Sequence, residues 1–250
     1  KLFRRSEDSS INDIAHCVNA GQVPEIPEPD GRTRTDAYFI ARPDAVSAAQ
    51  LVESLVADQI PNKFNIPSSE IWVLTPSNRG PLGVQALNGM LQQSLNPMEQ
   101  LDSEQLITVG DHTFRLRDRV CQRVNNYQID PNGVFNGDVG TISSVDRQNE
   151  SLKVELWDGR LIEYQRKDLS QLALGYALTV HRSQGSEVPC VVLTLHESHY
   201  TLLERQLIYT AITRAKKLLI IVGSKKALAL ACRRTNASRR LTNLRDRIIS

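Results

Sequence analysis

The segment most suited to chemistry in this sequence is LTVHRSQGSE, residues 178–187. It places hydroxyl, imidazole, amide and carboxylate groups just before the apolar run CVVLTL. Ligands of open α/β sheets bind at strand and helix ends, and Gly185 lets the backbone approach a phosphate or a sugar closely. The imidazole ring of His181 suits hydrogen bonding or stacking on a base. Each residue taken alone also fits a structural role, as a cap, a turn or a satisfied histidine.

A second segment, ERQLIYTAITRAKK at residues 204–217, combines an apolar helical face with cations at its end. Arg214 and Lys216 lie near the C-terminal end of the predicted helix, where the helix dipole favours positive charge. The alternative is catalytic, because the planar guanidinium of Arg214 could donate to a γ-phosphate during phosphoryl transfer. The residues alone leave both interpretations open.

The elements that must position these segments alternate between buried strands and helices. Short apolar runs predict strands at 37–41, 71–74, 190–195 and 218–222. Periodicity and capping residues predict helices within 1–20 (starting at Ser9 or Ser10) and at 44–56, 84–95, 176–183, 202–214 and 225–234. Apolar strands between helices predict a parallel sheet that is covered on both faces.

The middle of the chain has a different sequence pattern, which predicts short strands and frequent turns. Strands are predicted at 113–124, 139–145, 152–156 and 161–164, separated by turn signals such as Asn136-Gly137-Asp138. This spacing is typical of a small barrel, expected at about 137–169 as an insert in the α/β domain. Trp157 and Tyr164 are expected in its core; an extra guide for DNA is the alternative role for the insert.

Composition excludes several classes of protein. The chain has 250 residues, a hydrophobic fraction of 40% and a net charge of +2, and no apolar run approaches the roughly 20 residues of a membrane span. Its four cysteines are scattered without metal-ligand spacing, so no metal site is expected and buried thiols in a cytoplasmic protein are the simplest interpretation. Between residues 205 and 250, 12 Lys or Arg face a single acid. That excess suits either a polyanionic partner or a solvated helix face.

Both chemical segments resemble motifs of one family. LTVHRSQGSEVPCVVL and ERQLIYTAITRAKKLLIIVG resemble motifs V and VI of superfamily-one DNA helicases, most closely the RecD-like branch. LFRRSEDS resembles the FRQ-type motif that follows the first motor lobe, and VLTPSNRGPLGVQALNGMLQQSLNP resembles the motif IV region. FRLRDRVCQRVNNYQIDPNGVFNGDVGTI resembles the stretch that enters the SH3-like insert, with Arg117 where relatives often have Gly.

The resemblance implies an α/β fold: a RecA-like second motor lobe with its parallel sheet sandwiched by helices and interrupted by an SH3-like β-barrel. The lobe would comprise residues 1–136 and 170–250, and the insert residues 137–169. No GxxxxGK[ST] and no strand ending in an acidic pair occur in the sequence. The family therefore implies that ATP and Mg²⁺ are held mainly by an N-terminal motor lobe. This chain would be the C-terminal half and would be inactive alone.

The resemblance also assigns roles to residues. Arg214 resembles the motif VI arginine finger, and Arg4 resembles the arginine that reaches the γ-phosphate. The family has Gln after that arginine where this chain has Arg5, so either guanidinium could contact ATP. Motif V residues near the nucleotide correspond to Gln184, Gly185 and Glu187.

The DNA-contacting positions of the family fall elsewhere. Thr179 and His181 resemble the motif V residues that hold single-stranded DNA. The motif IV region, which faces the DNA strand in the family, contains Thr75, Arg79 and Asn88. The place where the lobe meets the insert contains Asn125, Asn126 and Tyr127.

The implied function is the C-terminal lobe of an ATP-dependent DNA helicase that moves 5′ to 3′, as RecD-like enzymes do. Its implied partners are single-stranded DNA, the N-terminal motor lobe and other recombination or repair subunits, with no membrane. Two alternatives stay open: a non-catalytic nucleic-acid-binding module, and an accessory subunit of a nuclease–helicase complex.

Overall fold

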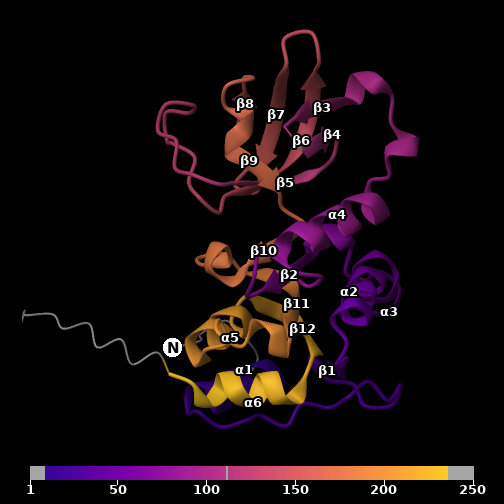
Figure 1. Ribbon diagram of the computed structural model, residues 1–250, viewed down its shortest axis with the longest axis vertical. Helices are drawn as coiled ribbons and strands as arrows, with labels where there is room; N and C mark the ends of the chain where they lie inside the picture. Colours follow the sequence, from indigo (N-terminus) through magenta and orange to yellow (C-terminus); the bar gives the residue numbers. More distant parts are fainter. Residues whose placement is uncertain (1–8, 111, 236–250) are drawn as a thin grey trace, which may run out of the picture.

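The computed structural model describes residues 9–110 and 112–235. The molecule has two parts along its long axis, an α/β part below and a β-rich part above (Figure 1). Within the described residues, no helix is long and apolar enough to cross a membrane.

The α/β part is built on a five-stranded sheet in which all strands are parallel. Its strands, in spatial order, are β1 (Ala37–Ala41), β12 (Ala215–Gly223), β11 (Val188–Leu195), β2 (Ile71–Thr75) and β10 (Ala177–Thr179). The strands are apolar at almost every position because both faces of the sheet are covered.

Helices cover the two faces in two groups (Figure 1). One face packs against α1 (Ser10–Asn19), α5 (Arg205–Ile212) and α6 (Lys225–Arg233). The other packs against α2 (Ala45–Ser54), the π-helical turn η1 (Leu55–Gln59), α3 (Ile60–Phe64) and α4 (Val84–Leu95). Successive residues of β2 alternate between these two cores, as a strand requires. The predicted sheet sandwiched by helices is confirmed.

The β-rich part is an antiparallel sheet with an added hairpin. The sheet contains β8 (Leu161–Tyr164), β7 (Ser151–Leu156), β6 (Val139–Asp146), β5 (Arg119–Gln122) and β9 (Leu172–Leu174), and the hairpin is β3 (Leu106–Val109) with β4 (His112–Arg115). Because β6 pairs with β5, and β5 with β9, this sheet extends beyond residues 137–169 on both sides. We propose that the insert is better bounded by the hairpin and β9.

Two predicted elements differ from the structure, one in type and one in continuity. The helix predicted at 176–183 is strand β10 followed by a 3₁₀ turn, η6 (Val180–Ser183), because β10 pairs with the end of β2. The single strand predicted at 113–124 is two strands, β4 and β5, broken by a turn. In that turn Arg117 has φ +71°, the left-handed backbone that glycine adopts freely. This turn therefore retains the conformation that glycine would favour.

The two aromatic residues of the insert have different environments. Tyr164 is fully buried in the barrel core and donates a hydrogen bond of 3.0 Å to Gln122 Oε1, as expected. Trp157 is 45% exposed, so its expected place in that core is wrong. Its ring instead packs on Trp72 of the parallel sheet, with centroids 5.2 Å apart. Trp157 therefore helps to join the two parts.

The junction between the parts contains a fully buried carboxylate, Asp118. One of its oxygens accepts hydrogen bonds from Asn96 Nδ2 and the Tyr176 hydroxyl, and the other accepts from Gln92 Nε2 and the Arg115 backbone N–H. Burial raises the pKa of the Asp118 carboxyl above its ordinary value, and these donors oppose the rise. The carboxylate thus ties α4 to the β-rich part.

Arg119, the next residue, is also buried and reaches across to the parallel sheet. Its Nη1 and Nη2 donate 2.8 Å hydrogen bonds to the carbonyl oxygens of Ile71 and Ser68. Its Cζ lies 5.8 Å from the ring centroids of both Trp157 and Tyr176. Burial lowers the pKa of Arg119 to about 10, which leaves the guanidinium charged at neutral pH.

Replacing Asp118 with Asn should destabilise the chain by about 2–4 kcal/mol, because an amide nitrogen would face two of the four buried donors. The free energy of unfolding in urea measures this loss. The matched control is Glu155→Gln on the exposed face of β7, which should change stability by less than about 0.5 kcal/mol. Equal stability of the two variants would contradict the role given to Asp118.

Buried His199, in the 3₁₀ turn η7 (Glu197–His199), gives the fold a pH dependence. Burial, aided by nearby His196, lowers its pKa from 6.5 to about 4. In the unfolded chain His199 therefore binds a proton below about pH 6.5, whereas in the folded chain it binds one only below about pH 4.

Lowering the pH from 6.5 towards 4 should thus cost at most about 3 kcal/mol of unfolding free energy through His199. Comparing urea unfolding of the parent and His199→Gln across this range isolates that contribution from other groups. The variant should lose less stability on acidification, and identical pH profiles would refute the assignment.

Candidate functional site

The two candidate segments, residues 178–187 and 204–217, meet at the edge of the parallel sheet where β11 and β12 begin. Gln184–Glu187 directly precede β11, and Arg214 directly precedes β12. Because these strands are adjacent and parallel, their preceding residues lie side by side. The Val188 N–H donates to the Arg214 carbonyl at 2.9 Å, which fixes the two segments against each other. Ligands of open α/β sheets usually bind at the opposite, carboxyl edge.

The Arg214 guanidinium lies against this loop and not in the hydrophobic interior. Its Nη1 donates to the Ser186 carbonyl at 3.0 Å, and its Nε donates to the Thr210 carbonyl at 3.1 Å. Its Nη2 donates to Thr213 Oγ1 at 3.2 Å. A guanidinium has five N–H donors, so these contacts orient Arg214 and leave donors for an anion.

The neighbouring loop residues are open to a ligand. Gly185 is exposed and has φ +91°, and no atom of the described residues lies within 4 Å of the place a Cβ would take. Glu187 is paired with Lys216, its Oε2 lying 3.7 Å from Nζ. The loop therefore offers an accessible backbone beside a fixed guanidinium, which is suitable for binding phosphate.

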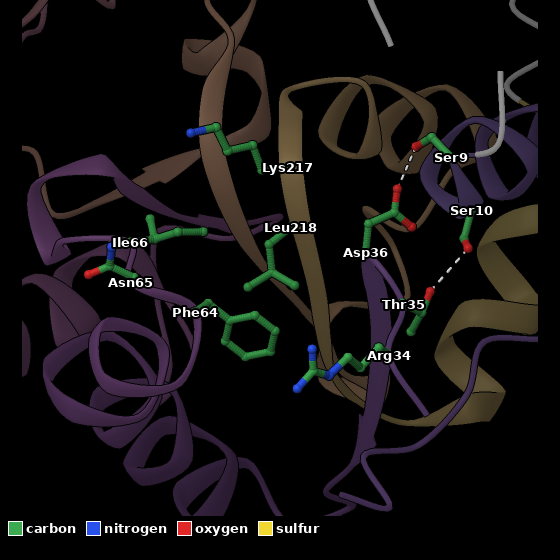
Figure 2. A pocket seen from close by; sticks show the side chains of 10 residues that line it. All are labelled: Ser9, Ser10, Arg34, Thr35, Asp36, Phe64, Asn65, Ile66, Lys217 and Leu218. Atoms are coloured by element: carbon green, nitrogen blue, oxygen red, sulfur yellow. Dashed lines mark hydrogen bonds between the residues drawn. The ribbon is translucent and has the colours of Figure 1, made fainter. Parts of the chain in front are cut away.

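A hollow of about 690 Å³ lies farther along the same edge, at the starts of β1 and β12 (Figure 2). Arg34 and Lys217 line it, and both side chains are exposed. Ser9, hydrogen-bonded to Asp36, lies on its rim. The candidate residues Arg4 and Arg5 fall outside the described residues. The edge from Gly185 to Arg34 is thus rich in positive charge.

The motif IV and V threonines lie side by side at the carboxyl ends of β2 and β10, where Thr75 is the register partner of Thr179. Thr75 is fully buried, and its hydroxyl donates to the Leu82 carbonyl at 2.6 Å. A direct contact between the Thr75 side chain and DNA is therefore excluded by burial. Its hydrogen bond holds the loop that carries Arg79. Thr179 is half-buried at the rim.

The side-chain amide of Asn88 is likewise engaged in internal hydrogen bonds. Its Nδ2 donates to the carbonyls of Leu174 and Ala177 at 3.1 Å, and its Oδ1 accepts from the Ala177 N–H at 2.8 Å. It fixes α4 to β10 and lies in the wall of a cleft. Asn126 also has an internal role: its Oδ1 accepts from the N–H groups of Gln128 and Ile129, and its Nδ2 donates to Gln171.

The other motif V candidates remain accessible. His181 and Gln184 are exposed and line a cavity of about 290 Å³ against α5. Thr210 of α5 lines the same cavity, and its carbonyl holds Arg214. Helix α5 thus lies beside candidates of both kinds: Arg214 and Gln184 for the nucleotide, and His181 for DNA.

A larger cleft, about 570 Å³, separates α4 from the β-rich part. Three arginines line it: Arg79 from the loop after β2, Arg123 from the end of β5, and Arg182 from η6. Sequence reasoning proposed only Arg79. Arg182 lies inside the motif that was singled out, next to His181, but no pattern in the sequence joins Arg123 to it. The three arginines give the cleft a positive charge, which suits a polyanionic ligand.

Among the described residues, no group of three His, Cys, Asp or Glu side chains is placed to hold a metal ion. The four cysteines are free; Cys121, Cys190 and Cys232 are buried, and Cys17 is half-buried. Burial raises the pKa of Cys121 to about 11, so its thiol is protonated at neutral pH.

Comparison with protein families gives two matches. Residues 174–222 match the UvrD-like helicase C-terminal domain, and residues 87–156 match the ATP-dependent RecD-like DNA helicase SH3 domain. The first match covers the sheet-edge loop and Arg214, and the second covers most of the β-rich part. Fold and site together define the C-terminal lobe of a superfamily-one helicase.

Comparison with individual proteins places the chain within that class. It is 33% identical over 258 residues to the ATP-dependent RecD2 DNA helicase of Deinococcus radiodurans, which covers 99% of this chain and 31% of that protein. It is 27% identical over 184 residues to the RecBCD enzyme subunit RecD of Mycolicibacterium smegmatis, covering 70% of this chain and 29% of that protein. The chain belongs to the RecD-like helicases and spans less than a third of either relative.

Solved structures share the fold. The crystal structure of Pif1 helicase from Bacteroides in complex with ADP-AlF3 and ssDNA aligns with a TM-score of 0.54 at 15% identity, over 91% of this chain and 52% of that one. Bacteroides Pif1 bound to ssDNA aligns with a TM-score of 0.51 at 16% identity and the same coverage. At such identity these matches support the architecture alone.

Proposed function

We propose that this chain is the second motor lobe of an ATP-dependent DNA helicase and supplies positive charge to ATP bound against an N-terminal lobe. The observation that supports this most strongly is Arg214, oriented by three hydrogen bonds beside the exposed Gly185 loop. Bound ATP would supply the phosphoryl group, and the family resemblance implies that the other lobe would hold Mg²⁺.

The residues of this edge fit a triphosphate in three ways. Arg214 offers unused N–H donors where negative charge develops during phosphoryl transfer. The Gly185 backbone is open, so an oxygen of the nucleotide can approach it. Arg34 and Lys217 add charge along the same edge, and the segment with Arg4 and Arg5 immediately precedes Ser9. Either of those two arginines remains a candidate second contact.

We propose that single-stranded DNA lies in the cleft between α4 and the β-rich part. Arg79, Arg123 and Arg182 would neutralise phosphates there, and such contacts are largely independent of sequence. Thr179 and His181 would contact the strand beside this cleft. Thr75, Asn88 and Asn126 would act as positioning residues. A 5′-to-3′ direction follows from the family resemblance.

The two sites are joined by a short stretch of chain. Residues 180–187 run from the end of β10, beside the DNA cleft, to the start of β11, beside Arg214. The side chain of Arg182 lines the cleft, and the carbonyl of Ser186 holds Arg214. A displacement at either end would therefore be transmitted through a few residues, as a motor that couples hydrolysis to DNA movement requires.

Replacing Arg214 with Ala in a full-length protein that contains this chain should reduce kcat for ATP hydrolysis by about 100-fold or more, since an arginine finger contributes about 10³–10⁵. Affinity for single-stranded DNA should change little. Steady-state ATPase assays and fluorescence anisotropy measure the two quantities. The control is Arg42→Ala, an exposed arginine at the opposite edge of the sheet.

An unchanged kcat in the Arg214 variant would reject its assignment. If the full-length parent binds DNA but hydrolyses no ATP, the alternative of a non-catalytic nucleic-acid-binding module would replace the proposal.

Replacing Arg79, Arg123 and Arg182 together with Gln should weaken binding of the chain to oligo-dT. It should also flatten the dependence of log Kd on log salt by up to about 2, because each phosphate contact on a single strand contributes about 0.7. Anisotropy titrations over a salt series give this slope. The charge-matched control replaces Arg147, Lys153 and Arg166, exposed residues of the β-rich part outside the cleft. Equal slopes for the two triple variants would show that DNA does not follow the cleft.

A further inference from the structure

The loop between β5 and β6, residues 123–138, presents aromatic side chains to solvent. Tyr127 is 69% exposed and Phe135 is 41% exposed. Their rings meet edge to face, with centroids 5.8 Å apart and an interplanar angle of 79°. Val124 beside them is 50% exposed. Exposed apolar side chains that lie together mark an interaction surface more often than those scattered singly.

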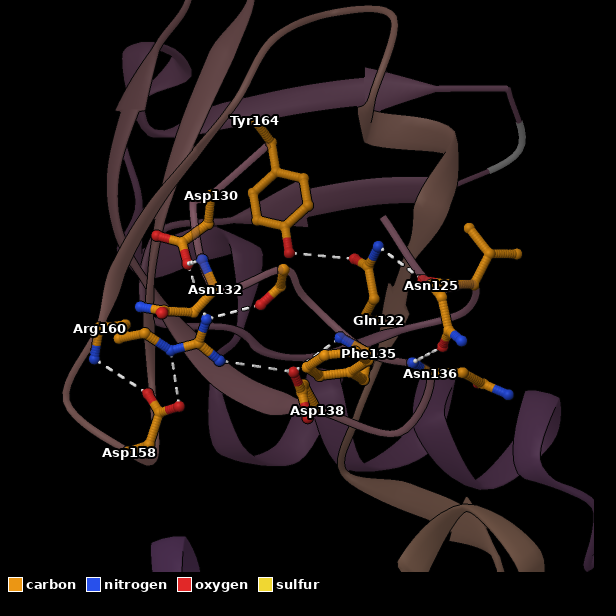
Figure 3. Close-up of polar contacts among 12 residues, drawn as sticks. Gln122, Asn125, Asp130, Asn132, Phe135, Asn136, Asp138, Asp158, Arg160 and Tyr164 are labelled. Carbon is orange, nitrogen blue, oxygen red and sulfur yellow. Dashed lines mark hydrogen bonds and ion pairs between the residues drawn. The ribbon is translucent and has the colours of Figure 1, made fainter. Parts of the chain in front are cut away.

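An arginine braces this loop from the barrel (Figure 3). Arg160 Nη1 donates to Asp130 Oδ1 at 2.9 Å and to the Gly133 carbonyl at 2.6 Å. Its Nε donates to Asp158 at 2.7 Å, and its Nη2 lies 3.7 Å from Asp138. Three carboxylates and a carbonyl thus converge on one planar cation, which fixes the loop and offsets its acidic charge.

Further contacts hold the two rings in place. The Phe135 N–H donates to Asp138 Oδ2 at 2.8 Å, and the Asn136 N–H donates to Asn125 Oδ1 at 2.9 Å (Figure 3). Gly133, at φ +72°, lies beneath the rings, and a Cβ there would come within 3.3 Å of Tyr127 and 3.4 Å of Phe135. The loop is therefore ordered in advance, so holding the rings outward costs little entropy on binding.

The loop adjoins the arginine-lined cleft at both of its ends. Arg123, in the wall of the cleft, is followed directly by Val124. Gly137, two residues after Phe135, packs on the backbone of Arg182, where a Cβ would lie 2.8 Å from the carbonyl oxygen. A nucleic-acid strand whose phosphates contact Arg123 and Arg182 would therefore pass the loop that carries Tyr127 and Phe135.

We propose that Tyr127 and Phe135 form a base-stacking platform for single-stranded nucleic acid. This inference rests on the proposed DNA cleft and adds a contact to the bases, where the arginines contact phosphates. Exposed aromatic rings stack on any base because every base has a π-face. The flanking cations favour a polyanionic strand over an acidic or apolar protein surface as the occupant.

The test compares binding of the 250-residue chain to oligo-dT and to an abasic strand of the same length. The parent should prefer the strand with bases, and Tyr127→Ala combined with Phe135→Ala should weaken oligo-dT binding roughly 5- to 100-fold. Binding of the abasic strand and the salt slope should stay unchanged. Tyr127→Phe should retain the preference, and Leu161→Ala, an exposed apolar residue of β8, is the matched control.

A strand carrying 2-aminopurine gives a second readout, since stacking on the rings should quench its fluorescence in the parent and not in the double variant. Suppose that the double variant binds both nucleic-acid strands like the parent, while the variant with Arg79, Arg123 and Arg182 replaced by Gln binds weakly. That result would refute the base-stacking platform and support the proposed DNA cleft. If the parent binds neither strand, the cleft and the platform both fail. Thermal unfolding of each variant shows whether a loss arises from misfolding.

Discussion

The arrangement of both sites depends on burying a carboxylate and a guanidinium from adjacent residues at the junction of two sheets. Asp118 accepts four hydrogen bonds, from Gln92, Asn96, Arg115 and Tyr176. Arg119 donates to the carbonyls of Ser68 and of Ile71, the first residue of β2, and its Cζ lies 5.8 Å from each of two aromatic ring centroids. Buried charges are costly unless they are fully paired. These contacts therefore favour one relative placement of the two sheets, and the arginine-lined cleft lies beside this junction, with Gln92 in its wall.

The second constraint is the short path between the two edges of the parallel sheet. β10 is only three residues long and pairs with the end of β2, so residues 180–187 must return along the sheet to reach the start of β11. The same stretch supplies an arginine to the cleft, packs on Gly137 of the insert and fixes Arg214 through Ser186. The insert, the cleft and the sheet edge with Gly185 and Arg214, which we propose binds the nucleotide, thus share one connection. That connection is the simplest physical route for coupling them.

Much of the fold could be predicted from local patterns. The runs at 37–41 and 218–222 are continuous and apolar, which is typical of strands buried on both faces. The helix at 84–95 was predicted to the residue, because Asn96-Pro97 ends it. The stretch 176–183 was misread as helical because its strand conformation is imposed from far away, by β2 and by the Asn88 side chain.

The candidate site was only partly predictable, for the same reason. Arg214 and Gly185 belong to continuous motifs, whereas Arg123 and Arg182 come together only when the β-rich part folds against α4. The resemblance predicts that Thr75 and Asn88 face DNA, yet the polar atoms of both side chains form internal hydrogen bonds. A residue type and its spacing do not reveal whether a hydrogen bond is already satisfied.

The most direct measurement of the central claim, that the nucleotide edge and the DNA cleft are coupled, is ATP hydrolysis by a full-length protein containing this chain, with and without saturating single-stranded DNA. The account predicts severalfold faster hydrolysis when DNA is bound. Tight binding of DNA with no change in the rate of hydrolysis would contradict it.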